Sequence, residues 1–447
     1  MGYVPATEKE RNAMLAFMGK NSMEDLFDFI PREVRLARPM ELPQAMAEPE
    51  VMACMTALAG KNIRYQTIFR GAGAYRHFIP SAVAHLSARE EFVTAYTPYQ
   101  AEMSQGVLQA IFEYQTMICE LTGMDASNAS VYDGASAAAE AVLMCKERNR
   151  KRVLLAGNIH PKTMAVIQTY TSAFHDMTVE MLPCVHGKTD PKVLKAAIGE
   201  DVCCFYSEIP NFYGMIEDIG LHAEIVHMCG AKYIAGVNPI ALGIFKTPCE
   251  CGADIAVGEG QPLGLPLSFG GPYLGFMACK QDMVRRMPGR IVGETVDVEG
   301  RRAYVLTLQA REQHIRREKA SSSLCSNEAL CALRASVYLS AMGPQGLAEV
   351  AAQCMSKAHY LAAELAKIGY TRPEANAEDE FFHEFVTVCP DDPFLVEKKL
   401  AQSGILSGFP LTGQCEYAGH MLWCVTELNT RAEMDEVVRL IRGGVAL

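Results

Sequence analysis

The sequence has no uninterrupted apolar run of 18 residues, no two cysteines at CxxC spacing and no excess of positive charge. The first absence argues against a membrane span. The second argues against a structural zinc site, which needs closely spaced ligand pairs, and we predict no metal site. With 41 basic and 52 acidic residues the net charge is −11, so neither nucleic acid nor an anionic membrane is expected as a partner.

The polar N-terminus lacks the basic flank and apolar core of a signal peptide, and the 16 cysteines are scattered along the chain. Scattered cysteines without a pairing pattern are typical of free, mostly buried thiols in a reducing compartment. Apolar residues make up 49% of the 447 residues and charged residues 21%, which is the profile of a soluble protein with a large core. We therefore expect a cytoplasmic protein.

Short β-rich runs alternate with helical patterns in the middle of the chain. This alternation predicts an α/β domain with a mainly parallel sheet, which binds ligands at the carboxyl ends of its strands. The expected helices begin near His160, Asp190 and Glu217. The expected strands are Val153–Ala156, Thr178–Leu182, Val202–Tyr206, Ala231–Val237 and Asp254–Val257.

The two ends of the chain have different patterns. Residues 1–100 are irregular and helical, with Thr7 and Glu10 placed as a capping box, and we expect an N-terminal arm that lies over a neighbour. Residues 101–325 form the expected large domain, and 326–447 a small C-terminal α+β domain. The last begins with two amphipathic patterns separated by Gly343, then a strand-like 384–389, a helix at 393–403, a strand-like 420–425 and a helix at 431–441.

A polar, aromatic loop at residues 94–106 is the first candidate site. Polar aromatics around a proline can line a pocket and bind a small polar ligand. The alternative is a helix entry with Ser104 as N-cap and the tyrosines packed at an interface. The candidate residues are Tyr96, Tyr99, Gln100, Glu102 and Gln105.

A second candidate is the turn Tyr132–Glu140, which opens a helix. Backbone N–H groups at a helix N-terminus form an anion site, so Asp133, Gly134 and Ser136 are candidate ligands of a phosphate. Simple capping by Asp133 is the alternative.

Two further segments carry unusual composition. The loop 258–272 is rich in glycine and proline, which predicts a close approach of its backbone to another group. In 308–320 several basic residues surround His314, and Arg311 is a candidate for clamping a carboxylate or phosphate. The alternative is a solvated helix face, since Glu312 and Arg316 are four residues apart.

Five long stretches together give a resemblance that covers most of the chain: 69–80, 94–141, 252–276, 287–297 and 306–320. They resemble the glycine decarboxylase family, the P-protein of the glycine cleavage system, and within it the N-terminal-type half (subunit 1) of members split into two subunits. The resemblance implies a pyridoxal-phosphate (PLP) dependent transferase fold of type I, the aminotransferase-like architecture.

The absence of lysine between Thr247 and Cys279 is informative in this family. Enzymes of this fold bind PLP covalently through a lysine in this region, and the resemblance places that lysine on the partner subunit. The corresponding place here is near Gln261–Leu263. Asn238 stands where fold type I enzymes often place an aspartate against the cofactor ring. We therefore expect no catalytic lysine, and no catalytic residue in this chain alone.

The resemblance also implies a reaction and partners. Subunit 2 would carry the PLP, glycine would be decarboxylated, and the aminomethyl group would pass to the oxidised lipoyl group of H-protein, within an α2β2 assembly. The candidates in 94–106 and 133–136, with Arg311 and His314, would line the cofactor site or the substrate channel.

Two other functions remain open at this point. One is an autonomous PLP-dependent aminotransferase or decarboxylase that uses Lys246 or Lys280, which flank the lysine-free stretch. The other is a non-catalytic paralogue that acts as a scaffold or regulator.

Overall fold

The computed structural model describes residues 6–36, 38–320, 322–413 and 416–442. It contains two compact units, Met1–Ile63 and Arg64–Leu447. The start of the polar N-terminus, residues 1–5, lies outside the described ranges. Within these ranges no helix is long and apolar enough to cross a membrane. The division into an arm, a large and a small domain at residues 100 and 325 stays a prediction.

The first unit contains two α-helices, α1 (Glu8–Phe17) and α2 (Glu48–Ala59). The predicted capping box is present: the N–H of Glu10 donates to Thr7 Oγ1, and the N–H of Thr7 donates to Glu10 Oε2 at 2.8 Å. Helix α2 buries none of its side chains. The unit therefore has little core of its own.

A seven-stranded sheet in the order β2-β10-β9-β8-β7-β3-β4 organises the second unit. Strands β9, β8, β7, β3 and β4 are parallel, and β10 runs antiparallel to both β9 and β2. The five predicted strands are all present, within two residues of their expected starts. The strand bounds are β2 (Ala126–Ser127), β3 (Arg152–Ala156), β4 (Thr178–Leu182), β7 (Val202–Ile209), β8 (Lys232–Val237), β9 (Ile255–Glu259) and β10 (Gly275–Cys279).

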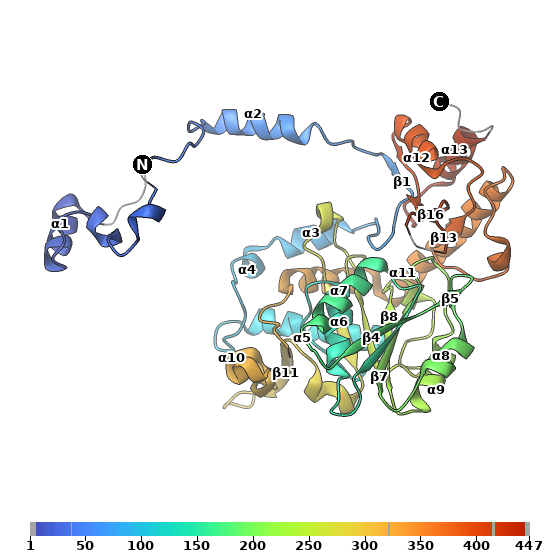
Figure 1. The fold of residues 1–447 in the computed structure, drawn as a ribbon, viewed down its shortest axis with the longest axis horizontal. Helices are drawn as coiled ribbons and strands as arrows, with labels where there is room; N and C mark the ends of the chain where they lie inside the picture. The colour runs from blue at the N-terminus through green and yellow to red at the C-terminus, as the bar shows by residue number, and fades with distance from the viewer. Residues whose placement is uncertain (1–5, 37, 321, 414–415, 443–447) are drawn as a thin grey trace. The chain divides into compact units, whose positions relative to one another are not determined.

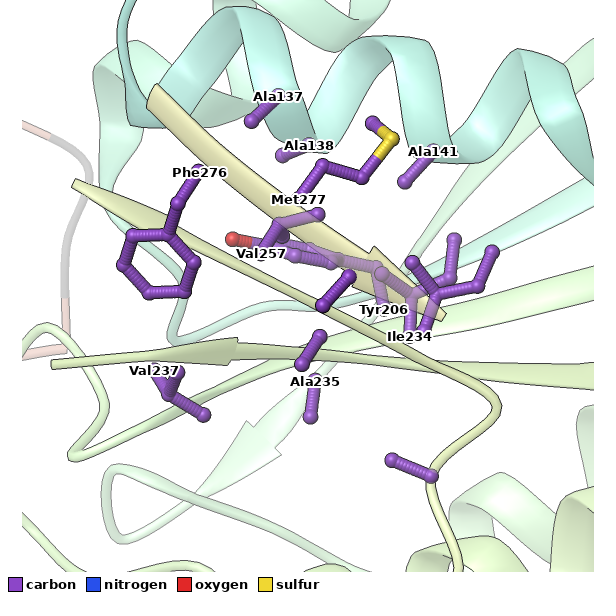
Figure 2. Packing of buried hydrophobic residues seen from close by; sticks show 14 of the residues in the cluster. Ala137, Ala138, Ala141, Tyr206, Ile234, Ala235, Val237, Val257, Phe276 and Met277 are labelled. Carbon is purple, nitrogen blue, oxygen red and sulfur yellow. The ribbon is translucent and has the colours of Figure 1, made fainter. Parts of the chain in front are cut away.

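Helices pack in pairs over this sheet (Figure 1). Helix α6 (Gly134–Met144) packs on α7 (Pro161–Ser172), and α8 (Pro191–Ala197) packs on α9 (Ile219–His227). Figure 2 shows Ala137, Ala138 and Ala141 of α6 facing the strands, opposite Val257 and Met277. Small side chains let the helix axis approach the sheet, which fixes the α6 N-terminus near the strand ends.

The two predicted amphipathic helices are present as the two segments of one kinked element, α11 (Ala329–Ala366). Its two segments meet at Gly343, whose φ of 61° is non-helical, and Pro344 follows. Gly343 thus separates the segments as predicted, because glycine tolerates positive φ.

The C-terminal part contains a three-stranded antiparallel sheet in the order β13-β16-β15, with two helices packed beside it. The observed elements match the predicted strand-helix-strand-helix pattern. Their bounds are β13 (Glu384–Thr387), α12 (Pro393–Gln402), β15 (Phe409–Pro410), β16 (Met421–Cys424) and α13 (Arg431–Ile441).

A hairpin of β11 (Ile291–Val296) and β12 (Arg302–Thr307) packs against α5 (Gln105–Thr122). The sequence analysis did not predict it. Two side-chain amides anchor it, that of the buried Gln115 and that of the half-buried Gln105. Gln115 bonds both backbone polar atoms of Val292, and Gln105 bonds both of Tyr304, all at 2.8–2.9 Å. The hairpin thereby fixes the segments on either side of it, 287–290 and 308–320.

Candidate functional site

A cavity of about 320 Å³ lies at the carboxyl ends of β7, β8 and β9, where open parallel sheets bind ligands. We call it the sheet-edge cavity. Its polar lining includes Tyr75, Asp133, His160, Lys162, Glu208, Asn238 and Glu259.

The α6 N-terminus, predicted as an anion site, opens on this cavity but already holds carboxylates. Asp133 caps the helix by accepting the N–H of Ser136 at 2.7 Å. The N–H of Gly134 donates to Glu259 Oε2 at 3.0 Å, and Glu259 Oε1 accepts the N–H groups of Gln261 and Leu274. These three hydrogen bonds lower the pKa of Glu259, but burial has the larger effect and raises this pKa to about 7.

His160 and Glu208 form another wall of the cavity. His160 Nδ1 accepts the N–H of Lys162 at 3.1 Å, so the ring proton lies on Nε2, which contacts Ala72 O at 2.9 Å. Glu208 accepts the N–H of His160 at 2.7 Å and the hydroxyl of Tyr206 at 3.0 Å. Burial raises the pKa of Glu208. These groups satisfy one another without a ligand.

The lysine-free stretch forms the remaining wall. Asn238 Oδ1 accepts the N–H of Ile240 at 2.9 Å, so its engaged oxygen caps a turn. Gln261 is 1% exposed, and its amide bonds the backbone of Tyr75 and Leu265. The close backbone approach predicted for 258–272 occurs within the chain itself, since a Cβ on Gly258 would lie 2.3 Å from Val237 O.

The two lysines that flank this stretch do not reach the cavity. Lys280 follows β10, and its Nζ donates to Gly252 O at 3.2 Å. Gly252 precedes β9, and β10 runs antiparallel to β9. Lys280 therefore lies at the amino end of β9, whereas the cavity lies at its carboxyl end. Lys246 is exposed and is not among the cavity residues. Of the lysines that the structure describes, only Lys162 lines the cavity.

A second group of polar residues surrounds Arg290, and we call it the arginine cluster. Arg290 and Glu312 are both buried and form an ion pair. The Arg290 guanidinium lies 4.5 Å from the ring centre of Tyr99 and donates to His314 Nδ1 at 3.3 Å. The hydroxyl of Tyr99 donates to Cys325 O at 3.0 Å.

Arg311 completes the arginine cluster. Its Nη2 donates to Gly289 O at 2.9 Å, while its buried Nε has no partner among the described residues. Burial, and then repulsion by Arg290, lowers the pKa of Arg311 to about 10. The cluster thus contains two arginines and only one carboxylate, that of Glu312. One oxygen of this carboxylate also has no hydrogen-bond partner among the described residues.

The residues predicted from the sequence therefore separate into three groups. Asp133, Gly134 and Ser136 belong to the sheet-edge cavity and its helix. Tyr99, Arg311 and His314 belong to the arginine cluster, and Gln105 holds the neighbouring hairpin. Tyr96, Gln100 and Glu102 are exposed. Among the described residues, no hydrogen bond or ion pair joins the arginine cluster to the cavity lining.

The sequence analysis missed several polar residues of these sites. Arg290 lies in one of the stretches that carry the family resemblance, but the unpredicted hairpin separates it in sequence from its partner Glu312. The alternative of a solvated helix face paired Glu312 with Arg316. The structure instead buries Glu312 against Arg290. His160, Glu208 and Glu259 stand at the ends or edges of predicted elements. Polar residues at carboxyl ends of strands are the signal that would have found the last two.

Comparison with known proteins gives a consistent result. Residues 1–441 match the family described as "Glycine cleavage system P-protein". The chain is 51% identical over 449 residues to the "Probable glycine dehydrogenase (decarboxylating) subunit 1" of Moorella thermoacetica, covering 100% of both chains. The same protein of Geobacillus kaustophilus is 47% identical over 448 residues, covering 99% of both.

Solved structures agree. The crystal structure of a glycine decarboxylase (P-protein) of the glycine cleavage system, in inhibitor-bound form, superposes with a TM-score of 0.90 at 44% identity, covering 99% of each chain. An aspartate aminotransferase from Thermus thermophilus is 15% identical with a TM-score of 0.58, over 84% of this chain and 98% of that one, and shares the fold alone. The predicted fold type I architecture is confirmed.

Proposed function

This chain belongs to the glycine cleavage system P-protein family, as a subunit 1 of glycine dehydrogenase (decarboxylating), and on that premise we propose that it completes an active site whose PLP is held by subunit 2. PLP supplies an electron sink for the charge left on glycine when CO2 departs. The observation that carries the proposal is the wall of the sheet-edge cavity. Gln261 lies near the place where a PLP lysine is expected, and Glu259 accepts the Gly134 N–H that a phosphate would use.

The loop after β9 offers no lysine for a covalently bound PLP. No lysine lies between Thr247 and Cys279, and Gln261 is fully engaged with the backbone of Tyr75 and Leu265. The Gly134 N–H that a phosphate would use already donates to Glu259. Asn238 is uncharged, so it is a poorer partner than an aspartate for a protonated pyridinium nitrogen. The cofactor therefore belongs on the partner.

The arginine cluster is this chain's contribution to the shared site. Arg311 carries a positive charge that no described carboxylate neutralises, and an unpartnered Nε. Arginine binds carboxylates and phosphates in a bidentate manner, so Arg311 orients either the glycine carboxylate or the cofactor phosphate of the partner's site.

His314 and Tyr99 support that role. Arg290 fixes His314 by donating to its Nδ1, which leaves Nε2 of a half-exposed ring to hold or move a proton. Tyr99 stacks under Arg290 and bonds Cys325 O, which positions the arginine cluster beside the exposed loop 94–106.

The loop 94–106 and its surroundings present apolar surface suited to subunit 2. Tyr96 is 98% exposed and Met103 is 83% exposed, and large exposed apolar groups of this kind mark interfaces. Gln100 and Glu102 of the same loop are also exposed, and we assign them to the channel that admits the lipoyl arm of H-protein. This arm is the acceptor of the aminomethyl group. The arm, residues 1–100, would lie over a neighbouring subunit of an α2β2 assembly.

We place the assembly in the cytoplasm. The cysteines that the structure describes are free thiols, and free thiols are stable in a reducing compartment.

A reconstitution experiment tests the proposed function. Exchange of labelled CO2 into the glycine carboxyl group is measured for each purified subunit with lipoylated H-protein and for their mixture. The proposal predicts exchange only for the mixture. Full exchange by subunit 2 and H-protein without this chain would instead favour the scaffold or regulatory alternative.

A further inference from the structure

Three side chains of types that can ligate a metal, distant in sequence, meet in the interior of the second unit. His77 follows β1 (Thr67–Ile68), Cys354 lies on α11, and Glu427 follows β16. One ligand atom from each lies within 4.8 Å of the others. His77 and Glu427 side chains are 2% and 9% exposed, and Cys354 is fully buried. The proposed decarboxylation uses none of them.

The distances among these atoms suit a shared ion. Glu427 Oε2 lies 2.8 Å from His77 Nδ1 and 3.4 Å from Cys354 Sγ. With metal–ligand bonds of about 2.0–2.3 Å, such separations correspond to ligand–metal–ligand angles of roughly 85–100°. Two of the three ligand pairs are therefore close enough to share a cation, and the third pair lies within 4.8 Å.

Unpartnered nitrogens surround the same place. His383 precedes β13 and is 2% exposed, yet neither ring nitrogen has a hydrogen-bond partner among the described residues, and neither has His77 Nε2. The two imidazole rings are 6.5 Å apart between centres. Buried polar atoms without partners are rare, so their concentration here points to a group that accepts nitrogen donors.

We propose that His77, Cys354 and Glu427 bind one divalent cation of the zinc class, with His383 as a further candidate nitrogen donor. A thiolate, an imidazole and a carboxylate form a mixed set that suits Zn2+. The Cys354 proton passes to solvent on binding, and thiolate plus carboxylate then neutralise the two charges of the ion. A neutral complex is the form that a buried site tolerates.

The bound cation would act as a structural clamp. It would join the segment after β1, helix α11 and the end of β16. Tyr75, which lines the sheet-edge cavity, packs its ring 4.6 Å from that of His383. The clamp would thus hold one wall of that cavity.

Metal analysis of the full-length chain tests the inference. After dialysis against Zn2+ and then metal-free buffer, we expect one zinc per chain by mass spectrometry. Replacement by Co2+ should give a thiolate-to-metal charge-transfer band. Cys354→Ser should abolish the band and weaken binding at least 100-fold, more than the roughly 10–100-fold typical of outer-shell changes. Cys331→Ser, a buried thiol on the same helix, should change neither.

Other outcomes overturn the proposal. Absence of zinc and of the cobalt band in the wild-type chain would mean that the cluster is a hydrogen-bonded network only. Binding that survives Cys354→Ser would place the metal elsewhere. If Cys354→Ser does not fold, His77→Gln serves instead. Anomalous scattering from zinc-soaked wild-type crystals needs no variant, and a peak anywhere but between the three side chains contradicts the site.

Discussion

The side-chain amide of Gln261 is hydrogen-bonded to both backbone polar atoms of Tyr75, accepting its N–H at 2.9 Å and donating to its carbonyl at 2.8 Å. Gln261 lies in the short stretch, Gln261–Leu263, near which the resemblance to PLP enzymes leads one to look for a lysine. An amide can act as donor and acceptor at once, whereas a lysine can only donate. The position has thus become a structural link between the loop after β9 and the segment that carries Tyr75.

Replacing Gln261 by Ala should destabilise the chain by roughly 2–4 kcal/mol, because two enclosed backbone groups of Tyr75 lose their partner. Urea unfolding measures the change. Gln353→Ala is the matched control, since that exposed amide bonds only Glu349. Equal stabilities of the two variants would show that the link contributes nothing.

Glu259 should make the stability of the chain depend on pH. Its pKa is raised by burial from 4.5 to about 7, so the folded chain holds a proton that the unfolded chain releases between these values. The stabilisation is therefore complete below pH 4.5 and lost as pH rises through 7. Glu259→Gln should remove a pH-dependent contribution on the order of 3 kcal/mol, measured as unfolding free energy across this window. An unchanged pH profile would refute the assignment.

Arg311→Gln should lower glycine–CO2 exchange by the assembled enzyme by roughly 100-fold or more, as expected for loss of a positioned charge. A role in binding the glycine carboxylate predicts an increase in KM for glycine, while a role toward the phosphate predicts weaker PLP retention by the assembly. The control is Arg316→Gln, an exposed arginine whose Nε bonds Ala310 O. Equal activity of both variants would remove Arg311 from the site.

Tyr99→Phe removes one hydroxyl and keeps the ring under Arg290. Stability should change by about 1 kcal/mol, the value of the bond to Cys325 O, while exchange by the assembled enzyme should fall by about 10-fold or more because a positioned polar group is lost. Thermal unfolding and exchange are measured on the same preparation. A loss of stability with full exchange would make Tyr99 purely structural.

The sequence predicted the parallel strands and the C-terminal elements well because their apolar runs and caps are local signals. The helix α13 (Arg431–Ile441) and the start of β4 at Thr178 were found at the predicted residues. The β11–β12 hairpin was missed, since its packing depends on the distant helix α5 that it contacts. The same limit applies to the sites: Arg290 pairs with Glu312 across the hairpin, and His77, Cys354 and Glu427 meet only after the chain has folded.

The individual site residues remain predictions. Asp133 and Gly134 lie where an anion site was expected, but the Gly134 N–H donates to the chain's own Glu259. That outcome could not be read from the sequence, because it needs the end of β9 to lie beside the start of α6.

The most direct test of the half-site account is the absorbance of the purified chain after addition of PLP, before and after borohydride. The account predicts no covalent, borohydride-reducible PLP on this chain, and such an adduct on subunit 2 in the active mixture. A stable reducible adduct on this chain alone, mapped by peptide analysis to Lys162 or to any other lysine, would contradict it and restore an autonomous PLP enzyme.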